Sequence, residues 1–455
     1  MSKLKEFIKN YFDFIIILVL ASITRILASI PNKVLMWDDA VYLLNAKWFA
    51  GQHIYFEALR APLLPFLLSF IYRIAPNTDE LFLMRLFIII PVLSILVTYF
   101  VAKKLFGRKV AFASALFMIA TPLHLSWGKL IGTDISGSLF VPLIIYFGIK
   151  GLKEDKYLYL SFLLTSLCTL TRYPTFILIL PLIIFYVINH RLNKKSIIFS
   201  ALLYLTPMFI WAGYNFINFG DPLFSAKQQL IVSGEPSPWN FFFTDAFNSY
   251  YLLLIVIIYG ILYTIPHIKN SKELQLITLF IISFFTLHML IPHKESRFLL
   301  SILPLISIIS TYHFKDLKNL NPFKIDRSKI TLIIIILMFL SFTYNYALFR
   351  DWSRCTGIIE ISKNLSGEVT SSVWPLVAYY GNVHTRPPED QLSKLQDYLL
   401  STNSSYFIIT NNSYWPSYVR DKNNFKNITI LTEEESLVDN CGVLYTKYKV
   451  NPQNI

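Results

Sequence analysis

Apolar runs of about 17 to 22 residues recur along roughly the first 350 positions of this 455-residue chain. A helix needs about 20 apolar residues to cross the hydrocarbon core of a bilayer, so these runs are typical of transmembrane helices. A soluble core could not enclose so many helices that are apolar on every side. The sequence therefore predicts an α-helical polytopic membrane protein.

The runs give about eleven predicted spans of the length that a bilayer requires. The first follows a Lys-rich start like that of a signal peptide, but it is long, has no clear small-x-small cleavage site and is followed by further spans, so we interpret it as a retained anchor helix. Pro174 disfavours one continuous helix between Tyr157 and Asn189, so we divide that stretch at Arg172. The predicted spans are residues 12–30, 82–102, 110–126, 134–150, 157–171, 173–190, 197–217, 249–267, 274–291, 297–313 and 330–348.

The formal net charge of +13 comes largely from short loops between these spans. Basic proteins often bind nucleic acid, but no basic patch with interleaved aromatic residues on a soluble fold is found here, and we expect no nucleic-acid partner. Every second loop is rich in Lys and Arg, which is typical of cytoplasmic loops. The basic residues concerned are Lys3, Lys5, Lys9, Lys103, Lys104, Arg108, Lys109, Lys150, Lys153, Lys156, Arg191, Lys194, Lys195, Lys269, Lys272, Lys315, Lys318, Lys324, Arg327 and Lys329. We therefore predict a cytoplasmic N-terminus and an outer C-terminus.

The loops on the predicted outer side are the longer ones. The first, residues 31–80, contains an apolar stretch, Pro62–Ile74, that is too short to span a bilayer and is expected to be a re-entrant or interfacial helix. Residues 349–455 follow a transmembrane domain of residues 1–348 and form a predicted small α/β domain, with a helix near Asp390–Leu400. Its predicted strands are Glu368–Trp374, Tyr406–Thr410, Ile428–Thr432 and Gly442–Tyr448.

Two features of this last segment agree with an outer location. It contains all four Asn-x-Ser/Thr sequons of the chain, at Asn364, Asn403, Asn411 and Asn427. It also contains Cys355 and Cys441, for which a disulfide and two free thiols both fit the sequence.

Acidic residues near the predicted outer membrane surface are candidates for catalysis, because charges at membrane depth are costly. Asp38 and Asp39 follow the first span, and Asp134 opens the fourth. Each could cap a helix N-terminus. Alternatively, carboxylates at this level could orient and deprotonate a hydroxyl group, with one of Asp38 and Asp39 serving as base and the other capping a helix that begins at Ala40.

Basic residues at the same level are candidates for binding an anionic headgroup. We interpret Arg25 as snorkelling to the outer interface. Arg60 could anchor to lipid headgroups, whereas Arg172 lies at the predicted helix break and is suited to bidentate phosphate contact. His293, Lys294 and Arg297 share one turn between two spans, either as a snorkelling loop or as part of the same site.

Several of these motifs resemble those of the GT-C glycosyltransferases. The segment Trp37-Asp38-Asp39-Ala40-Val41-Tyr42 is similar to the Asp-Glu-Ala-x-Tyr motif of lipid A aminoarabinose transferases and protein O-mannosyltransferases, with Asp39 in place of Glu. Arg60-Ala61-Pro62-Leu63 resembles their Lys-Pro-Pro-Leu, and Thr133-Asp134 resembles the Thr-Asp of their fourth span. His293-Lys294-Glu295-Ser296-Arg297-Phe298 resembles the His-Lys-Glu-x-Arg-Phe motif of dolichyl-phosphate-mannose mannosyltransferases, and Gly220-Asp221-Pro222-Leu223 also recurs in such chains.

The resemblance covers about residues 1–350 and implies an inverting glycosyltransferase. The implied donor is a polyprenyl or dolichyl monophosphate sugar, with mannose as the expected sugar, and the acceptor is a glycan, a lipid or a protein. Asp38 is expected to activate the acceptor hydroxyl, with Asp134 and Asp39 as the other catalytic candidates. The implied phosphate-binding residues are Arg60, Arg172, His293, Lys294 and Arg297.

No Gly-rich phosphate loop and no His/Cys cluster with metal-ligand spacing is found in the sequence, so we expect neither a cofactor nor a resident metal. The expected location is the cell membrane, or the endoplasmic reticulum membrane in a eukaryote. Two other functions stay open: a polytopic transporter or lipid flippase, which also uses intramembrane charges, and a membrane protein that binds glycans without catalysis.

Overall fold

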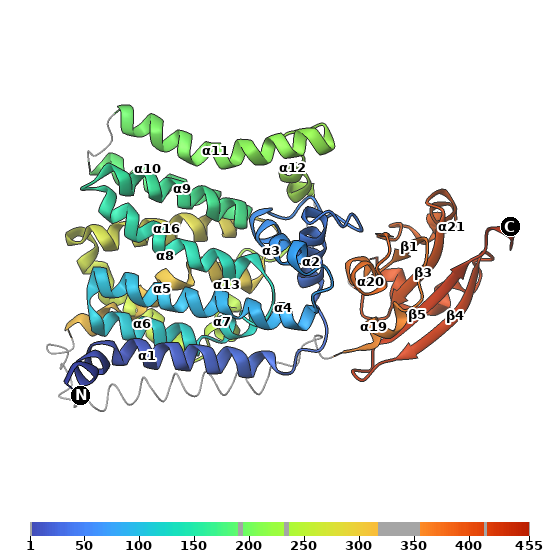
Figure 1. Ribbon diagram of the computed structural model, residues 1–455, viewed down its shortest axis with the longest axis horizontal. Coiled ribbons are helices and arrows are strands. Elements are labelled where there is room, and N and C mark those ends of the chain that lie inside the picture. The colour runs from blue at the N-terminus through green and yellow to red at the C-terminus, as the bar shows by residue number, and fades with distance from the viewer. Residues whose placement is uncertain (1, 190–193, 232–235, 317–354, 414–415, 455) are drawn as a thin grey trace. The chain divides into compact units, whose positions relative to one another are not determined.

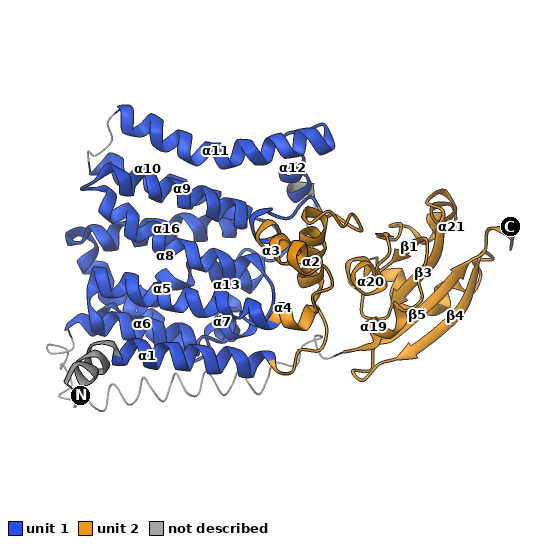
Figure 2. Cartoon of the chain, in the orientation of Figure 1, with its two compact units in different colours: residues 1–29, 58–64, 85–349 blue, residues 30–57, 65–84, 350–455 orange. Residues whose placement is uncertain are grey.

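A computed structural model describes residues 2–189, 194–231, 236–316, 355–413 and 416–454 of the chain. The chain divides into two compact units (Figure 2). The first comprises residues 1–29, 58–64 and 85–349, and the second comprises residues 30–57, 65–84 and 350–455. The predicted domain boundary after residue 348 and the predicted span 330–348 lie outside the described residues.

The first unit is a bundle of long helices that run alongside one another (Figure 1). Helix α8 packs against α5, α9 and the 3-10 helix η3, and α11 packs against α9. The elements are α1 (Ser2–Ser29), α5 (Ile89–Phe106), α6 (Arg108–Ala120), α7 (Pro122–Trp127), α8 (Thr133–Gly151), α9 (Asp155–Thr171), η1 (Tyr173–Leu178), α10 (Ile179–Ile188), α11 (Lys194–Phe219), α12 (Phe224–Ile231), α13 (Phe241–Thr244), α14 (Ala246–Tyr250), α15 (Leu253–Thr264), η2 (Ile265–Asn270), α16 (Lys272–Leu290), η3 (Ser296–Ile302), α17 (Leu303–Thr311) and η4 (Tyr312–Asp316).

Local sequence explains where several of these helices begin and end. Gly107 separates α5 from α6 with a φ of +93°, a conformation that favours glycine. Pro122 is the first residue of α7, since proline lacks the N–H that would continue α6. The predicted break at Arg172 is confirmed, because this residue has extended backbone between α9 and η1.

The polytopic membrane fold is confirmed. Helices occupy every predicted span from 12–30 to 297–313. Among the described residues, 7 helical segments are long and apolar enough to cross a membrane, at 12–29, 80–106, 133–151, 194–219, 253–270, 272–290 and 296–316. The core between the helices is apolar, and Tyr99, Phe117, Phe185 and Phe280 are buried in it.

The second unit combines helices of the first predicted outer loop with an α/β fold around one sheet. Its helices include α2 (Trp37–Phe49), most of α3 (Leu63–Ile74) and part of α4 (Glu80–Phe87). Its other elements are α19 (Gly357–Ile361), β1 (Glu368–Ser371), α20 (Trp374–Gly381), β2 (Thr385–Arg386), α21 (Leu392–Ser401), β3 (Ser404–Thr410), η6 (Ser417–Arg420), η7 (Lys422–Phe425), β4 (Leu431–Val438), β5 (Leu444–Val450) and η8 (Pro452–Asn454).

The sheet has the strand order β2-β1-β3-β5-β4. Strand β1 is parallel to β2 and to β3, whereas β5 is antiparallel to both β3 and β4. The predicted small α/β domain is therefore confirmed, with two corrections. The short strand β2 was not predicted, and the strand predicted at Ile428–Thr432 begins only at Leu431 and continues to Val438.

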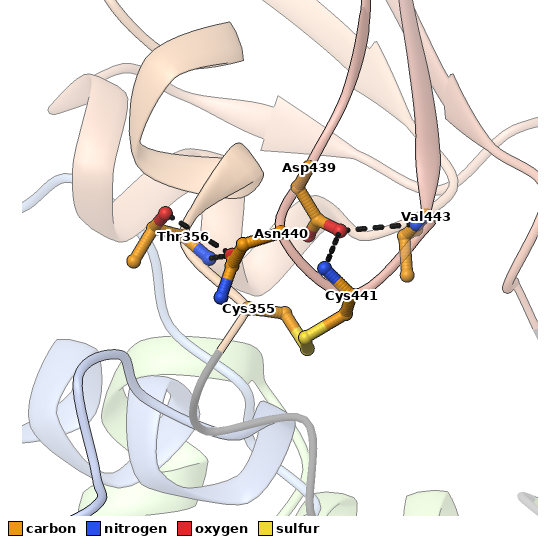
Figure 3. Close-up of a disulfide and its surroundings, with 6 residues drawn as sticks. All are labelled: Cys355, Thr356, Asp439, Asn440, Cys441 and Val443. Carbon is orange, nitrogen blue, oxygen red and sulfur yellow. Dashed lines mark hydrogen bonds between the residues drawn. A yellow bond between two sulfur atoms is a disulfide. The ribbon is translucent and has the colours of Figure 1, made fainter.

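A disulfide joins Cys355 to Cys441 at the turn between β4 and β5 (Figure 3). Asp439 stabilises this turn by accepting hydrogen bonds from the backbone N–H groups of Cys441 (2.8 Å) and Val443 (3.0 Å). Of the two possibilities that the sequence left open for these cysteines, the structure has the disulfide. The remaining cysteine, Cys168, is buried in the first unit.

Candidate active site

A buried ion pair between Asp134 and Arg172 forms the centre of the candidate site in the first unit. Asp134 is the second residue of α8, whose N-cap is Gly132, and Arg172 is the residue at which α9 ends. Only 9% of the Asp134 side chain and 10% of the Arg172 side chain are exposed. Because the N-cap of this helix is Gly132, the alternative in which Asp134 is the N-cap is wrong. The carboxylate of Asp134 contacts Arg172.

Arg297, near the start of η3, joins this pair from a third element. Its Nε lies 4.0 Å from Oδ2 of Asp134 and 2.8 Å from Oε2 of Glu295. A second nitrogen of the guanidinium donates to Oε1 of Glu295 at 2.8 Å. The Arg297 guanidinium is thus held beside the carboxylate of Glu295 by an ion pair and one hydrogen bond.

Both arginines lie over aromatic rings. The guanidinium carbon of Arg172 is 4.8 Å from the ring centre of Phe298, and that of Arg297 is 4.6 Å from the ring centre of Trp127. Cation–π contacts of this kind orient a guanidinium without neutralising its charge. The two rings therefore help to fix the positions of both guanidinium groups.

The two other basic residues of this motif have different surroundings. His293 contacts Oε1 of Glu295 through Nε2 at 3.1 Å, and its side chain is 39% exposed. Lys294 is buried, and its ammonium donates to the backbone carbonyls of Ser237 and Pro292 at 3.4 Å. In this conformation Lys294 fixes the segment around Ser237, whereas His293 shares the carboxylate of Glu295 with Arg297.

Arg60 is placed next to the helix break by its backbone. Its carbonyl accepts a hydrogen bond of 3.4 Å from the hydroxyl of Tyr173, the residue that follows Arg172. The same hydroxyl accepts a hydrogen bond from Nε1 of Trp211 at 2.9 Å. Two of the predicted phosphate-binding arginines, Arg60 and Arg172, therefore belong to adjacent backbone segments.

Asp38 and Asp39 lie in the first turn of α2, in the second unit. Asp39 is fully buried, and its Oδ2 accepts a hydrogen bond of 2.8 Å from the backbone N–H of Met36. Asp38 is half-buried. The helix begins at Trp37 and not at Ala40 as predicted, but Asp39 does bind a free N–H group at its start, as a capping residue does.

The interpretation of Arg25 as a snorkelling residue is wrong. Arg25 is fully buried, and its guanidinium donates to the backbone carbonyls of Met118 and Ile119, each at 3.0 Å. These carbonyls belong to the last turn of α6, which ends before Pro122 and leaves its final acceptors without intrahelical partners. Arg25 also contacts Nδ1 of His124 at 2.5 Å, so it stabilises this helix end.

The sequence did not single out three residues that shape the site: Glu295, Trp127 and Tyr173. Glu295 was visible in the His-Lys-Glu-x-Arg-Phe motif, but its bridging of His293 and Arg297 requires coordinates. In the described residues, the group of three potential metal ligands that lie together is Cys355, Asp439 and Cys441 in the second unit. Both cysteines of that group are in the disulfide, which removes their thiolates (Figure 3).

The comparison with family models supports the resemblance seen in the sequence. A model described as dolichyl-phosphate-mannose-protein mannosyltransferase matches residues 59–212, a range that includes Arg60, Asp134 and Arg172. No curated protein sequence matches the chain significantly.

Solved structures with a similar fold extend the comparison to nearly the whole chain. ArnT of Cupriavidus metallidurans bound to undecaprenyl phosphate has a TM-score of 0.66 and 10% identity, over 96% of this chain and 98% of that chain. The Archaeoglobus fulgidus oligosaccharyltransferase AglB, in complex with an inhibitory peptide and a dolichol-phosphate, has a TM-score of 0.61 and 13% identity, over 98% of this chain and 75% of that chain. The arabinofuranosyltransferase AftD from Mycobacteria has a TM-score of 0.57 and 12% identity, over 96% of this chain and 40% of that chain.

All three of these proteins are GT-C glycosyltransferases. At this level of identity the match is a match of fold, and the family model adds sequence similarity over residues 59–212. The predicted resemblance is thereby confirmed, and the chain has the fold of the GT-C glycosyltransferases.

Proposed function

We propose that this protein is an inverting glycosyltransferase that moves a sugar, with mannose as the first candidate, from a polyprenyl or dolichyl monophosphate to an acceptor hydroxyl on the outer face of the membrane. The observation that carries the proposal is the grouping of Arg172 and Arg297 around the carboxylate of Asp134. Two oriented guanidinium groups beside a carboxylate match the needs of a reaction that releases a phosphate monoester.

The reaction needs positive charge at the leaving group. When the bond between the sugar C1 and the phosphate oxygen breaks, the electron pair goes to the phosphate, which leaves as the polyprenyl phosphate dianion. Arginine binds such an anion through two parallel hydrogen bonds and remains charged at any physiological pH. Arg172 and Arg297 are proposed to bind the phosphate, with Arg60, His293 and Lys294 completing the basic set.

The reaction also needs a base for the acceptor. The acceptor oxygen forms the new bond to C1 on the face opposite the phosphate, which inverts the configuration, and its proton passes to a carboxylate. Asp134 is already engaged by Arg172, which makes it better suited to hold the arginines in place than to take the proton. Asp39 binds the N–H of Met36. Asp38, which stands at the first acid of the motif that resembles Asp-Glu-Ala-x-Tyr, is the proposed base, with Asp134 aiding it by orienting the phosphate-binding arginines.

The donor class is supported by what the relatives bind. One similar structure holds undecaprenyl phosphate and another holds a dolichol-phosphate, both of which are polyprenyl monophosphates. The matching family model is named for dolichyl-phosphate-mannose, which supports mannose as the first sugar to test. The acceptor is a glycan, a lipid or a protein.

The proposed location is the cell membrane, or the endoplasmic reticulum membrane in a eukaryote, with a cytoplasmic N-terminus and the α/β fold of residues 355–454 on the outer side. The disulfide between Cys355 and Cys441 supports this orientation, because disulfides persist in oxidising compartments. An outer site also agrees with a donor whose lipid carrier stays in the bilayer.

A transfer assay tests the proposal. Purified protein in detergent is incubated with radiolabelled polyprenyl-phosphate mannose, and in parallel with other polyprenyl-phosphate sugars, together with membrane extracts as acceptor. We expect label in the acceptor fraction, release of polyprenyl phosphate in equal amount, and loss of both in Arg297→Ala. A flippase would be favoured if no donor gave transfer of its sugar while the donor moved from one leaflet to the other in vesicles that contain the protein.

A further inference from the structure

Helix α20 of the second unit packs along α2, the helix that begins with the pair Asp38 and Asp39. The two helices are far apart in the sequence, since α2 spans Trp37–Phe49 and α20 spans Trp374–Gly381. Helix α20 lies between β1 and β2, so the sheet holds it in place. Aromatic residues of α20 contact both ends of α2.

The N-terminal end of α2 is fixed by two contacts with α20. The rings of Trp37 and Trp374 meet edge to face with their centres 4.5 Å apart. The hydroxyl of Tyr380 accepts a hydrogen bond of 2.8 Å from the backbone N–H of Leu35. The residues on both sides of Met36 are thus anchored, and Asp38 follows them directly.

The C-terminal end of α2 is fixed in a similar way. The ammonium of Lys47 lies 4.1 Å from the ring centre of Tyr379, and the Tyr379 hydroxyl is 3.3 Å from that of Tyr72 in α3. A cation–π contact in a desolvated setting is stronger than one at an exposed site. Helix α2 therefore cannot tilt without breaking contacts to α20 at one end or the other.

A chain of hydrogen bonds connects Trp374 to the loop that follows α2. Its indole N–H donates to the hydroxyl of Tyr55 at 3.0 Å, and this hydroxyl donates to Oε2 of Glu57 at 3.1 Å. The backbone N–H of Glu57 donates to the side chain of Asn45 in α2 at 2.8 Å. Trp374 thus stabilises α2 directly through Trp37 and indirectly through this loop.

The Tyr380 hydroxyl is well suited to its role as acceptor. Burial raises the pKa of Tyr380 above its ordinary value, and the negative charges of Glu80 and then Asp39 contribute in the same direction. The neutral phenol presents an oxygen lone pair to the N–H of Leu35.

We propose that Trp374 and Tyr380 are positioning residues that hold the start of α2, and with it the carboxylate of Asp38, in the geometry that catalysis requires. This inference rests on the proposed function, in which Asp38 is the base. A base must lie within hydrogen-bond reach of the proton that it accepts, and a displacement of about 1 Å can cost roughly 100-fold in rate. On this proposal, α20 of the C-terminal α/β fold contributes to catalysis by positioning α2 within the second unit.

Conservative variants test this proposal against a matched control. Tyr380→Phe removes only the hydroxyl that contacts Leu35, and Trp374→Phe keeps an aromatic ring while it removes the indole N–H. Tyr398→Phe is the control, because its hydroxyl also forms a hydrogen bond with the backbone, by donating to the carbonyl of Pro387 at 2.9 Å, but this contact does not involve α2. We expect kcat for transfer to fall about 10-fold in each of the first two variants, with donor KM unchanged within about 2-fold. The control should stay near wild type in both.

A measurement that is independent of activity accompanies the kinetics. Hydrogen exchange followed by mass spectrometry should show faster exchange in peptides covering residues 33–44 of Tyr380→Phe, and unchanged exchange in β3 and β5. If kcat of Tyr380→Phe and Trp374→Phe matches that of Tyr398→Phe, or if exchange at residues 33–44 is unchanged, the proposal is overturned. If wild type transfers no sugar from any donor while exchange is accelerated as expected, the proposed function has failed and the structural contact stands.

Discussion

The carboxylate of Asp134 and the guanidinium of Arg172 form an ion pair that links the first turn of α8 to the residue at which α9 ends. Both side chains are almost completely excluded from solvent, and Arg297 approaches the same carboxylate from η3. Three segments that are distant in the sequence thus converge on one charge cluster.

Loss of one partner of this buried pair should destabilise the protein strongly. Asp134→Asn leaves the charge of Arg172 without its main counter-ion, and we expect a loss of about 3–5 kcal/mol in the free energy of unfolding. Arg108→Ala is the control, because Arg108 pairs with Asp13 but its side chain is 53% exposed; a change of about 0–1 kcal/mol is expected there. Thermal unfolding in detergent compares the two. Equal losses in both variants would contradict a special role for burial.

Arg297 should affect use of the donor more than stability. Arg297→Ala removes a guanidinium that is held by Glu295 and Trp127, and we expect kcat/KM for the donor to fall on the order of 100-fold. Arg297→Lys should recover only part of this, because an ammonium cannot form two parallel hydrogen bonds. Initial rates at varied donor concentration measure both. Wild-type values of kcat and KM in both variants would remove Arg297 from the site.

Asp38 and Asp39 should differ in their effects on turnover. Asp38→Asn removes the proposed base, which typically costs about 10²–10⁴ in rate, while expression and donor binding stay near normal. Asp39→Asn keeps an oxygen that can accept from the N–H of Met36, so it should lose less. Single-turnover rates with saturating donor decide between them. An inactive Asp39→Asn beside an active Asp38→Asn would reverse the assignment, and two active variants would favour the transporter.

Membrane orientation can be tested with single cysteines, because Cys168 is buried and the other two cysteines are bridged. Lys153, in the basic loop between α8 and α9, and Gln229, in α12, are both exposed positions. In intact cells, an impermeant thiol reagent should label Gln229→Cys and leave Lys153→Cys unlabelled until the membrane is opened. The reverse labelling would invert the proposed topology and the location of the site.

The four sequons should be used unequally in a host that glycosylates asparagine outside the cytoplasm. Asn364, Asn403 and Asn427 are exposed, and the Ser or Thr of each sequon is at least partly exposed. At the fourth sequon, the side-chain oxygen of Asn411 accepts a hydrogen bond of 3.0 Å from Leu444, and Ser413 is buried. Glycopeptide mass spectrometry should therefore find Asn411 unmodified and the other three modified. Modification of Asn411 alone would contradict this reasoning.

The membrane part of the fold was predictable because its signals are local. Hydropathy identified the helices, and Pro174 marked the break at Arg172. Strand β4 was displaced in the prediction because Glu433, Glu434 and Glu435 lack the alternation of a strand. As an edge strand it tolerates exposed charges, and Lys447 on β5 pairs with Glu435 at 2.8 Å.

Sequence reasoning selected three charged residues that the structure brings together, but it could not predict their contacts. Asp134, Arg172 and Arg297 could be selected because a charge at membrane depth is energetically costly. Their mutual distances, however, depend on how α8, α9 and η3 pack. The prediction for Arg25 was wrong for the same reason. Arg25 binds the carbonyls at the end of α6, which lie at least 93 residues away in the sequence. Likewise, no sequence pattern predicts the edge-to-face contact between the rings of Trp374 and Trp37.

The hydrogen bond between Leu35 and Tyr380 spans 345 residues of sequence. A ribosome that adds about 5–20 residues per second needs on the order of tens of seconds to travel from one partner to the other. During that interval most of the bundle can insert into the membrane, while the start of α2 still lacks the helix that orders it. The start of α2 is therefore ordered late in biosynthesis, and a chain released before α20 is expected to be inserted without the contacts that position the proposed base.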